Sequence, residues 1–305
     1  MKAAGVRLAV PMPGHPVAPG SKAAAAALDA SHELVGLIRS HDVVMVLTDT
    51  RESRWLPTLI SASTATPCIN VALGFDSCLV IRSGCGFPGP KSGISDSGSG
   101  SDPAEDPDRL GCYFCQDVVA PADSTQGRTL DQQCTVTRPG LAPIASALAA
   151  ELAIGLLHHP MGFRAPHDDG ASPGGSLPSD SGSEFGALPH CARFFLRRWQ
   201  PVLGGSRAFE HCSACGAAVC RQWNEDPDHF LLRAMNDDDT SGDRRAGEGD
   251  SGAQSGFLEE ASGLAQMKRD MDGKQAAARS DGTRDGASAP EMPEGGGTGS
   301  AAFRA

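Results

Sequence analysis

The chain has 305 residues, ten cysteines and a formal net charge of −11. This charge disfavours non-specific nucleic-acid binding, which requires Lys and Arg against phosphate, but it permits a basic protein partner. Gly, Ser, Asp and Pro crowd residues 84–109, 165–187 and most of 237–305, and such stretches lack the apolar side chains that offset chain entropy. We therefore expect low-complexity inserts and a disordered tail around one folded domain of roughly 190 residues.

The sequence shows no signal peptide and no clear transmembrane segment. Residues 1–5 contain no long apolar run. The most apolar stretch, residues 141–157, is short for a membrane span and contains Pro143 and Glu151. We therefore expect a soluble cytoplasmic protein, in which cysteines are more often metal ligands, nucleophiles or core residues than disulfides.

The first elements in chain order predict an α/β fold. An Ala-rich helix is expected from about residue 21 to residue 40. The continuous apolar run at residues 42–49 is typical of a strand buried on both faces, as in a parallel sheet. Thr50 can cap a following helix through Ser63, and residues 68–73 supply a second strand that closes a β-α-β unit.

The later elements are less regular. Residues 77–82 predict an edge or antiparallel strand. A helix is expected from near Thr137 to about His158, and because it is apolar nearly all round we expect it to be central. Further along, we expect a short basic and aromatic segment at residues 190–200 and a helix at residues 220–235. Residues 257–260 form an apolar island in the tail, and such islands often dock onto a partner.

Two Cys-x-x-Cys pairs, 100 positions apart, give the strongest chemical signal. Zinc takes four soft ligands at tetrahedral angles, and a Cys-x-x-Cys turn presents two thiolates from one knuckle. Four cysteines leave no open coordination position, so we expect a structural zinc held by Cys112, Cys115, Cys212 and Cys215. Two unrelated half-motifs or core thiols are the alternative. The possible substitutes for one ligand are Cys191, Cys220, His190 and His211.

An isolated cysteine, Cys134, lies between the two pairs. Polar residues 131–133 favour its exposure, and a helix that begins near Thr137 would place the thiol beside unpaired amides that lower its pKa. Asp123 and Asp131 would oppose that effect if they were close. A buried structural cysteine is the commoner role for a lone thiol, so position alone leaves both the nucleophilic and the structural role open.

Asp49 follows the first predicted strand, at the sheet edge where open α/β proteins bind ligands. Its carboxylate is suited to hold magnesium together with nucleotide phosphates, although an N-capping or turn role is equally consistent with its position. Arg54, like Arg51, is a candidate phosphate ligand at a nucleotide site, with exposed pairing to Glu52 as the ordinary alternative.

Several motifs closely resemble the autophagy-related protein 7 family. These are PMPGHP at residues 11–16, DTRESRWLP at 49–57, LGCYFC at 110–115 and RTLDQQCTVTRPG at 128–140. The motifs are long, so the resemblance is specific. It covers about residues 5–82, 110–163 and 188–235.

The resemblance implies the homodimeric activating enzyme for the two ubiquitin-like modifiers of autophagy, with a partial Rossmann-like adenylation domain of the ubiquitin-activating (ThiF) type. Such an enzyme adenylates the modifier's C-terminal glycine with Mg-ATP, takes it as a thioester on a cysteine and passes it to a conjugating enzyme. By motif match, Cys134 is the thioester cysteine, Asp49 the magnesium and nucleotide-site acid, and the paired cysteines the zinc ligands. Residues 116–133 resemble the crossover loop. The implied location is the cytoplasm and the pre-autophagosomal structure.

The sequence also departs from the family. The glycine-rich nucleotide loop, the phosphate-contacting arginine and lysine, and the large N-terminal domain would precede Met1, so we expect the chain alone not to form the adenylate. Residues 1–235 would be the C-terminal half of the adenylation domain, and residues 236–305 a mostly disordered tail with a modifier-recruiting segment near 257–264. The alternative is a non-catalytic, zinc-stapled interaction module derived from such an enzyme.

Overall fold

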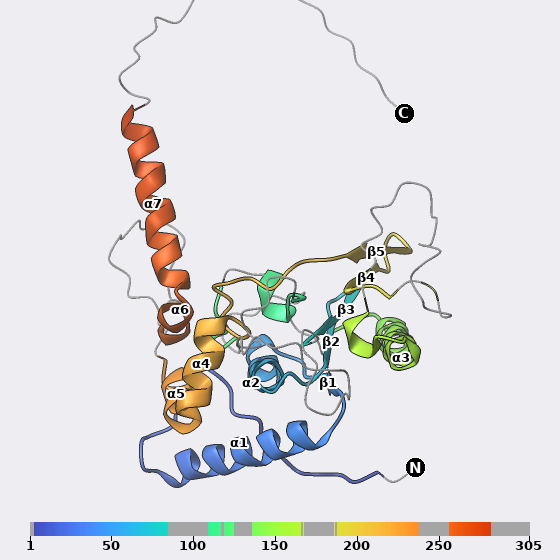
Figure 1. The fold of residues 1–305 in the computed structure, drawn as a ribbon, viewed down its shortest axis with the longest axis horizontal. Helices are drawn as coiled ribbons and strands as arrows, with labels where there is room; N and C mark the ends of the chain where they lie inside the picture. Colours follow the sequence, from blue (N-terminus) through green and yellow to red (C-terminus); the bar gives the residue numbers. More distant parts are fainter. Residues whose placement is uncertain are drawn as a thin grey trace, which may run out of the picture. The chain divides into compact units, whose positions relative to one another are not determined.

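The computed structural model describes residues 3–84, 109–116, 119–124, 136–165, 167, 186, 188–237 and 256–281. The chain divides into two compact units, residues 1–265 and residues 266–305. The elements, in chain order, are α1 (Lys22–Ser40), β1 (Val44–Val46), α2 (Arg51–Ser63), β2 (Cys68–Leu73), β3 (Ser77–Ser83), η2 (Tyr113–Gln116), α3 (Leu141–His158), η4 (Gly162–Arg164), β4 (Cys191–Phe195), β5 (Gln200–Gly204), α4 (Ala217–Glu225), α5 (Pro227–Met235), α6 (Phe257–Ser262) and α7 (Leu264–Asp281) (Figure 1).

The sheet of the first unit has five strands in the order β1-β2-β3-β4-β5. β1 and β2 run parallel, with Val44 opposite Cys68, and each later pair is antiparallel. The α/β prediction is therefore confirmed, including the β-α-β unit formed by β1, α2 and β2. Because β1 and β2 are parallel, the residues that follow both strands meet at the same sheet edge.

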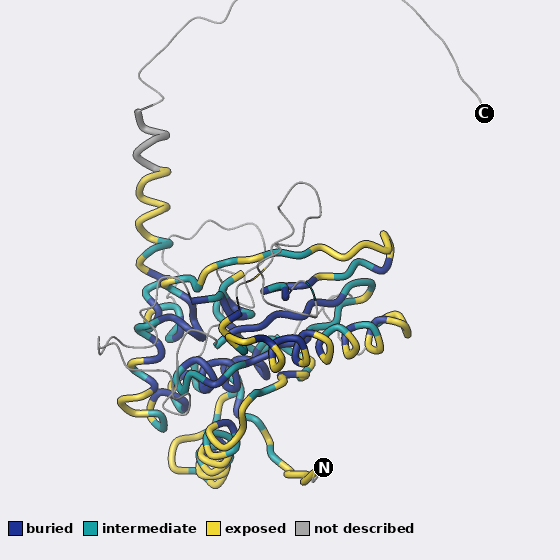
Figure 2. The backbone as a smooth tube through the Cα atoms, turned by 45° about the vertical axis from the view of Figure 1, so that its right-hand side comes forward, coloured by how far each residue is buried: buried dark blue, intermediate teal, exposed yellow. Residues whose placement is uncertain are grey.

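The start of α2 is set by a capping box. The Thr50 hydroxyl accepts a hydrogen bond from the Ser53 amide at 3.2 Å, and the Ser53 hydroxyl accepts one from the Thr50 amide at 3.2 Å. This reciprocal arrangement satisfies two amides that the first helical turn leaves unpaired. Almost every residue of α2 is buried, which Figure 2 shows as a dark blue coil. The helix therefore holds the ends of β1 and β2 in a fixed relation.

The two faces of the sheet carry different helices. Side chains of Ile69, Val71 and Val80 point toward α3 and form one apolar cluster with it. On the opposite face Asn70 points toward α2, where its amide donates a 3.2 Å hydrogen bond to the Thr58 hydroxyl. The alternation follows from the two-residue period of a strand, and it gives a helix–sheet–helix arrangement around β2 (Figure 1).

Helix α3 differs from its predicted place. It begins at Leu141 and not near Thr137, and it lies on one face of the sheet with Ile154 and Leu157 exposed. Among the described residues it is the one helix long and apolar enough to cross a membrane by length and composition. One side of α3 nevertheless packs on β2 and β3, as the core helix of a folded domain does.

The strand predicted at residues 77–82 is antiparallel but not an edge strand, because β4 pairs with it on its other side. The basic and aromatic segment at 190–200 supplies β4, the turn and the first residue of the hairpin strand β5. Trp199 in that turn has φ of 49°, a conformation that usually calls for Gly or Asn. The usual sequence signal of a hairpin is therefore missing.

The segment that follows α5 carries further helices, in a region that the sequence predicts to lack structure. Asp226 caps α5 through the His229 amide, and it separates α5 from α4 where one continuous helix was expected. α6 packs on α4 and α5, where Leu258 is 1% exposed and the Arg233 guanidinium lies 4.1 Å from the centre of the Phe257 ring. The predicted docking island thus docks within its own chain. In the second unit, helix α7 continues to Asp281.

Candidate functional site

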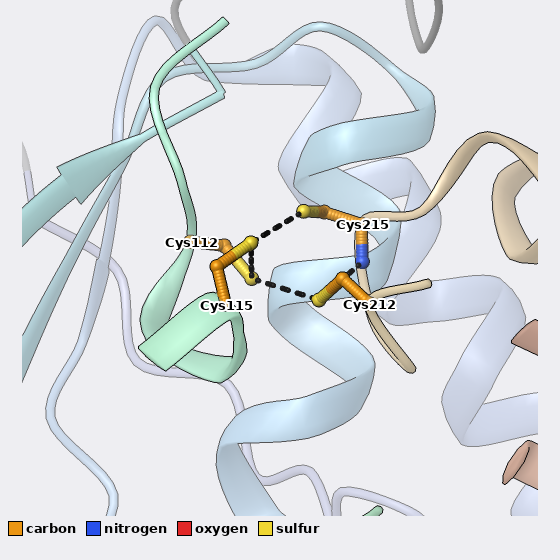
Figure 3. A group of neighbouring side chains, drawn as sticks. All are labelled: Cys112, Cys115, Cys212 and Cys215. Carbon is orange, nitrogen blue, oxygen red and sulfur yellow. Dashed lines mark hydrogen bonds between the residues drawn. The ribbon is translucent and has the colours of Figure 1, made fainter. Parts of the chain in front are cut away.

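The four paired cysteines come together as one group. Their sulfurs all lie within 4.8 Å of one another, and three of the separations are 3.4, 3.6 and 3.8 Å. Figure 3 shows the Cys112–Cys115 turn facing the Cys212–Cys215 turn, with the sulfurs pointing inward. Tetrahedral Zn–S bonds of about 2.3 Å would place sulfurs about 3.8 Å apart, so the group fits a four-coordinate zinc.

Backbone amides support the thiols in the manner of metal knuckles. The amides of Phe114, Cys215 and Phe209 donate to the sulfurs of Cys112, Cys212 and Cys115 at 3.3, 3.4 and 3.3 Å respectively. Such bonds stabilise negative charge on sulfur. The donor set and its supporting amides are therefore those of a structural metal site with no open position.

Burial and contacts between the thiols shift the pKa values of these cysteines in different directions. Burial raises the pKa of Cys112 and Cys212 well above the ordinary thiol value. Hydrogen bonds from neighbouring thiols, Cys112 first, lower the pKa of Cys115. Thiols must lose their protons to bind metal, and four neighbouring thiolates repel one another. A bound dication would offset that repulsion.

The proposed substitute ligands do not join this group among the described residues. His190 is fully buried and bridges two backbone segments: its Nε2 donates to the Gly111 carbonyl at 2.7 Å and its Nδ1 accepts from the Ser206 amide at 3.0 Å. The His211 Nδ1 donates a 3.0 Å hydrogen bond to the Ser262 carbonyl. The two histidines thus hold the backbone beside the knuckles and have a positioning role.

Other buried contacts around the centre come from residues to which the motifs assign no role. The Trp55 indole of α2 donates to the Ser213 carbonyl at 2.9 Å, and the buried Arg109 guanidinium donates to the Cys215 carbonyl. Gly111 is enclosed, because a Cβ there would lie 2.9 Å from the Arg207 carbonyl oxygen. Trp55 thus holds the second Cys-x-x-Cys turn against α2, and Arg109 holds the same turn to the segment before Cys112.

The buried histidine predicts a pH effect on stability. Burial lowers the pKa of His190 to about 4, whereas an unfolded chain has about 6.5. The unfolded state therefore binds the proton first, and the folded state should lose about 2 kcal/mol between pH 7 and pH 5. Chemical denaturation of wild type and His190→Gln at both pH values measures this loss, which should shrink by most of that amount in the variant.

His32→Gln is the matched control for that measurement, because His32 is an exposed histidine paired with Asp228 at 2.7 Å. It should keep the wild-type pH dependence. The zinc content of each protein, measured at both pH values, separates acid-driven loss of metal from this effect. Equal losses between pH 7 and pH 5 in His190→Gln and wild type would exclude His190 as the source.

The nucleotide-site candidates occupy two different environments. Asp49 is exposed between the end of β1 and the start of α2, a place open to a ligand at this sheet edge. Arg54 is buried, and its Nη1 donates to the Val71 carbonyl at 2.6 Å. Its guanidinium also lies 5.3 Å from the centre of the Tyr113 ring. Arg54 thus links α2 to β2 and η2 in this structure.

A cavity of about 250 Å³ opens at the edge where β2 ends. Its lining includes Arg51, Leu73, Tyr113 and Arg193, which come from α2, β2, η2 and β4. Arg51 donates to the Val119 carbonyl at 2.7 Å, and its guanidinium lies 5.7 Å from the centre of the Phe114 ring. Two arginines therefore face a pocket next to the candidate zinc turn, where an anionic group would be stabilised.

Cys134 lies outside the described residues, so its role stays a prediction. The described chain resumes at residue 136, and α3 begins at Leu141, seven positions after Cys134. The effect of a helix dipole falls off within the first turn. The structure of α3 therefore gives no support to the predicted dipole effect on this thiol, and the case for Cys134 rests on its motif.

Comparison with known proteins gives a consistent set of relatives, although no protein-family model matches the chain. The ubiquitin-like modifier-activating enzyme ATG7 of Cryptococcus neoformans var. neoformans is 39% identical over 272 residues, covering 89% of this chain and 36% of that protein. The Homo sapiens protein of this name is 44% identical over 249 residues, covering 77% and 35%. That of Dictyostelium discoideum is 43% identical over 233 residues, covering 75% and 31%. The chain spans about a third of the length of these relatives.

Proposed function

Because the chain belongs to the family of ubiquitin-like modifier-activating enzymes named ATG7, we propose that it supplies the part of such an enzyme that receives an activated modifier as a thioester. The substrates are the ubiquitin-like modifiers of autophagy. The partners are their conjugating enzymes and a second copy of the enzyme, acting in the cytoplasm. Family membership does not favour the alternative of a non-catalytic module.

The structural observation that supports this proposal is the arrangement at the edge of the sheet, which suits the activation step that precedes the thioester. The exposed Asp49 follows β1, and the cavity lined by Arg51 and Arg193 lies where β2 ends. Parallel strands direct their carboxyl ends to one edge, which is where α/β proteins of the Rossmann type bind nucleotides. An exposed acid and two cationic side chains at that edge suit a magnesium-bound phosphate and a carboxylate tail.

Each residue then has a separate task. Mg-ATP, when bound, supplies the adenylyl group that activates the modifier's terminal carboxylate. The Asp49 carboxylate would hold the magnesium, and Arg51 and Arg193 would orient the anionic groups in the cavity. Arg54 would act there indirectly, because its guanidinium donates to the Val71 carbonyl and fixes α2 against β2.

The thioester step belongs to Cys134. Its thiolate attacks the carbonyl carbon of the adenylated C-terminal glycine, so that a carbon–sulfur bond forms, the bond to the phosphate oxygen breaks and AMP leaves. A cysteine of the conjugating enzyme then attacks the same carbonyl carbon, so that the acyl group forms a bond to that sulfur, the bond to the Cys134 sulfur breaks and the Cys134 thiol is regenerated. A structural zinc at Cys112, Cys115, Cys212 and Cys215 would fix η2 and the cavity wall that η2 provides.

Asp49→Asn tests the nucleotide part of this proposal. The exchange leaves size and exposure unchanged but removes the charge that holds magnesium, so pyrophosphate–ATP exchange should fall about 100-fold or more. The assay uses the longest natural protein that contains these residues. Asp42→Asn, at an exposed acid just before β1, is the matched control and should keep full exchange. Wild-type exchange in Asp49→Asn would refute the role of Asp49.

A further inference from the structure

A second group of possible metal ligands lies apart from the cysteines and outside the proposed function. His15, Glu52 and Asp123 each offer one ligand atom, and these atoms lie within 4.8 Å of one another. The three residues come from an amino-terminal turn, from the first turn of α2 and from the segment 119–124. Residues far apart in the sequence therefore converge on one point.

The three ligand atoms are close together but beyond hydrogen-bond distance. His15 Nε2 lies 3.6 Å from Asp123 Oδ1 and 3.9 Å from Glu52 Oε1, which is too long for direct hydrogen bonds. In the part of the chain that the structure describes, this buried nitrogen has no hydrogen-bond partner. It thus lies within ion-pair distance of two carboxylate oxygens but beyond hydrogen-bond distance of both.

Backbone and hydroxyl contacts hold the group in place. The Glu52 side chain is 0% exposed, and the Ser124 hydroxyl lies 2.8 Å from both of its carboxylate oxygens. Gly14 has φ of 74°, and a Cβ at this position would lie 2.5 Å from the Asp123 amide nitrogen. The turn before His15 can approach Asp123 so closely only because residue 14 is glycine.

We propose that His15, Glu52 and Asp123 form a binding site for a divalent transition cation. One imidazole nitrogen and two carboxylate oxygens are a donor set for Mn²⁺ or Zn²⁺. Bonds of about 2.1 Å at ordinary angles place donor atoms about 3.0–3.7 Å apart. The His15–Asp123 spacing already satisfies this, and the Glu52 oxygen lies just beyond it.

A bound cation would have two consequences for this part of the molecule. It would place a dication beside the fully buried Glu52 carboxylate. It would also fasten segment 119–124 to the start of α2, and this segment precedes Cys134 by ten residues. The site differs in residues and donor chemistry from both the four-cysteine centre and Asp49.

Titration with Mn²⁺ tests the site. The 305-residue chain is first given one equivalent of zinc, which the four thiolates take, so that the oxygen and nitrogen ligands stay open to manganese. The six-line electron paramagnetic resonance signal of free Mn²⁺ then measures binding. We expect one equivalent bound in wild type, and at least tenfold weaker binding in His15→Gln. Mn²⁺ should also raise the melting temperature of wild type but not that of His15→Gln.

His32→Gln is again the matched control, because it removes an imidazole that pairs with a carboxylate at 2.7 Å on the exposed surface. It should bind Mn²⁺ like wild type. Asp123→Asn, at a side chain that is 26% exposed, gives an independent variant should His15→Gln lose its near-ultraviolet circular dichroism. No bound Mn²⁺ in wild type, or equal affinities in His32→Gln and the site variants, would overturn the proposal and leave a histidine–carboxylate cluster without a metal.

Discussion

Removal of zinc by a strong chelator is expected to lower the melting temperature by about 10–20 °C, because the metal would join segments 100 residues apart. Closing a loop of this length restricts the unfolded chain by about 4–5 kcal/mol, and in a domain of this size 1 kcal/mol corresponds to about 2–4 °C. The effect reaches the core, because Cys112, Cys212, Trp55 and Phe230 belong to one apolar cluster. Calorimetry of the zinc-loaded and stripped protein measures the shift.

Substitution should reproduce the chelator effect. Cys212→Ser removes one of four ligands and should lower both the zinc content and the melting temperature. Cys191→Ser, at a buried cysteine of β4 outside the group, should retain one zinc per chain. If the stripped protein melts at the same temperature as the zinc-loaded protein, the metal does not hold the two cysteine-bearing segments together.

Replacing Cys134 with alanine is expected to abolish the thioester with the modifier, a loss of at least about 1,000-fold, because alanine offers no nucleophile. Adenylation precedes this step, so pyrophosphate–ATP exchange should persist. The reductant-sensitive adduct is measured on a denaturing gel, with the longest natural protein that contains these residues. The two readouts separate loss of the nucleophile from loss of the nucleotide site.

Cys191→Ser serves as the cysteine control here too, and it should form the thioester at the wild-type level. A reductant-sensitive adduct at full yield in Cys134→Ala would show that another cysteine accepts the modifier. The case for Cys134 would then fail, although adenylation by the same protein would remain possible.

The parts of the fold that follow from the sequence are those specified locally. Residues 68–73 form β2 as their apolar run indicates, and Thr50 caps α2 as its position before the helix indicates. In the same way, two Cys-x-x-Cys pairs predict a four-thiol site because each turn determines the geometry of its own two sulfurs. In these three cases the residues of a short segment are enough to predict its own structure.

Other features depend on contacts that no local pattern encodes. Trp199 takes a left-handed turn without glycine, so the hairpin of β4 and β5 has no turn signal. Because α3 is apolar nearly all round, its sequence does not show whether one side or the whole helix is buried. Arg109 belongs to no motif, and the sequence offers His190 only as a substitute zinc ligand; folding makes both hydrogen-bond partners of the backbone at the cysteine turns. These residues become informative only through tertiary contacts.

The intact mass of Cys134→Ser protein, after incubation with Mg-ATP and an autophagy modifier, tests the proposed activity most directly. Serine places an oxygen where the thiol would be, so the expected product is an ester that resists reductant and is cleaved by hydroxide. Its mass should equal both proteins minus one water, and peptide mapping should place it at residue 134. No adduct in Cys134→Ser, together with a wild-type protein that forms none, would contradict thioester formation at this residue.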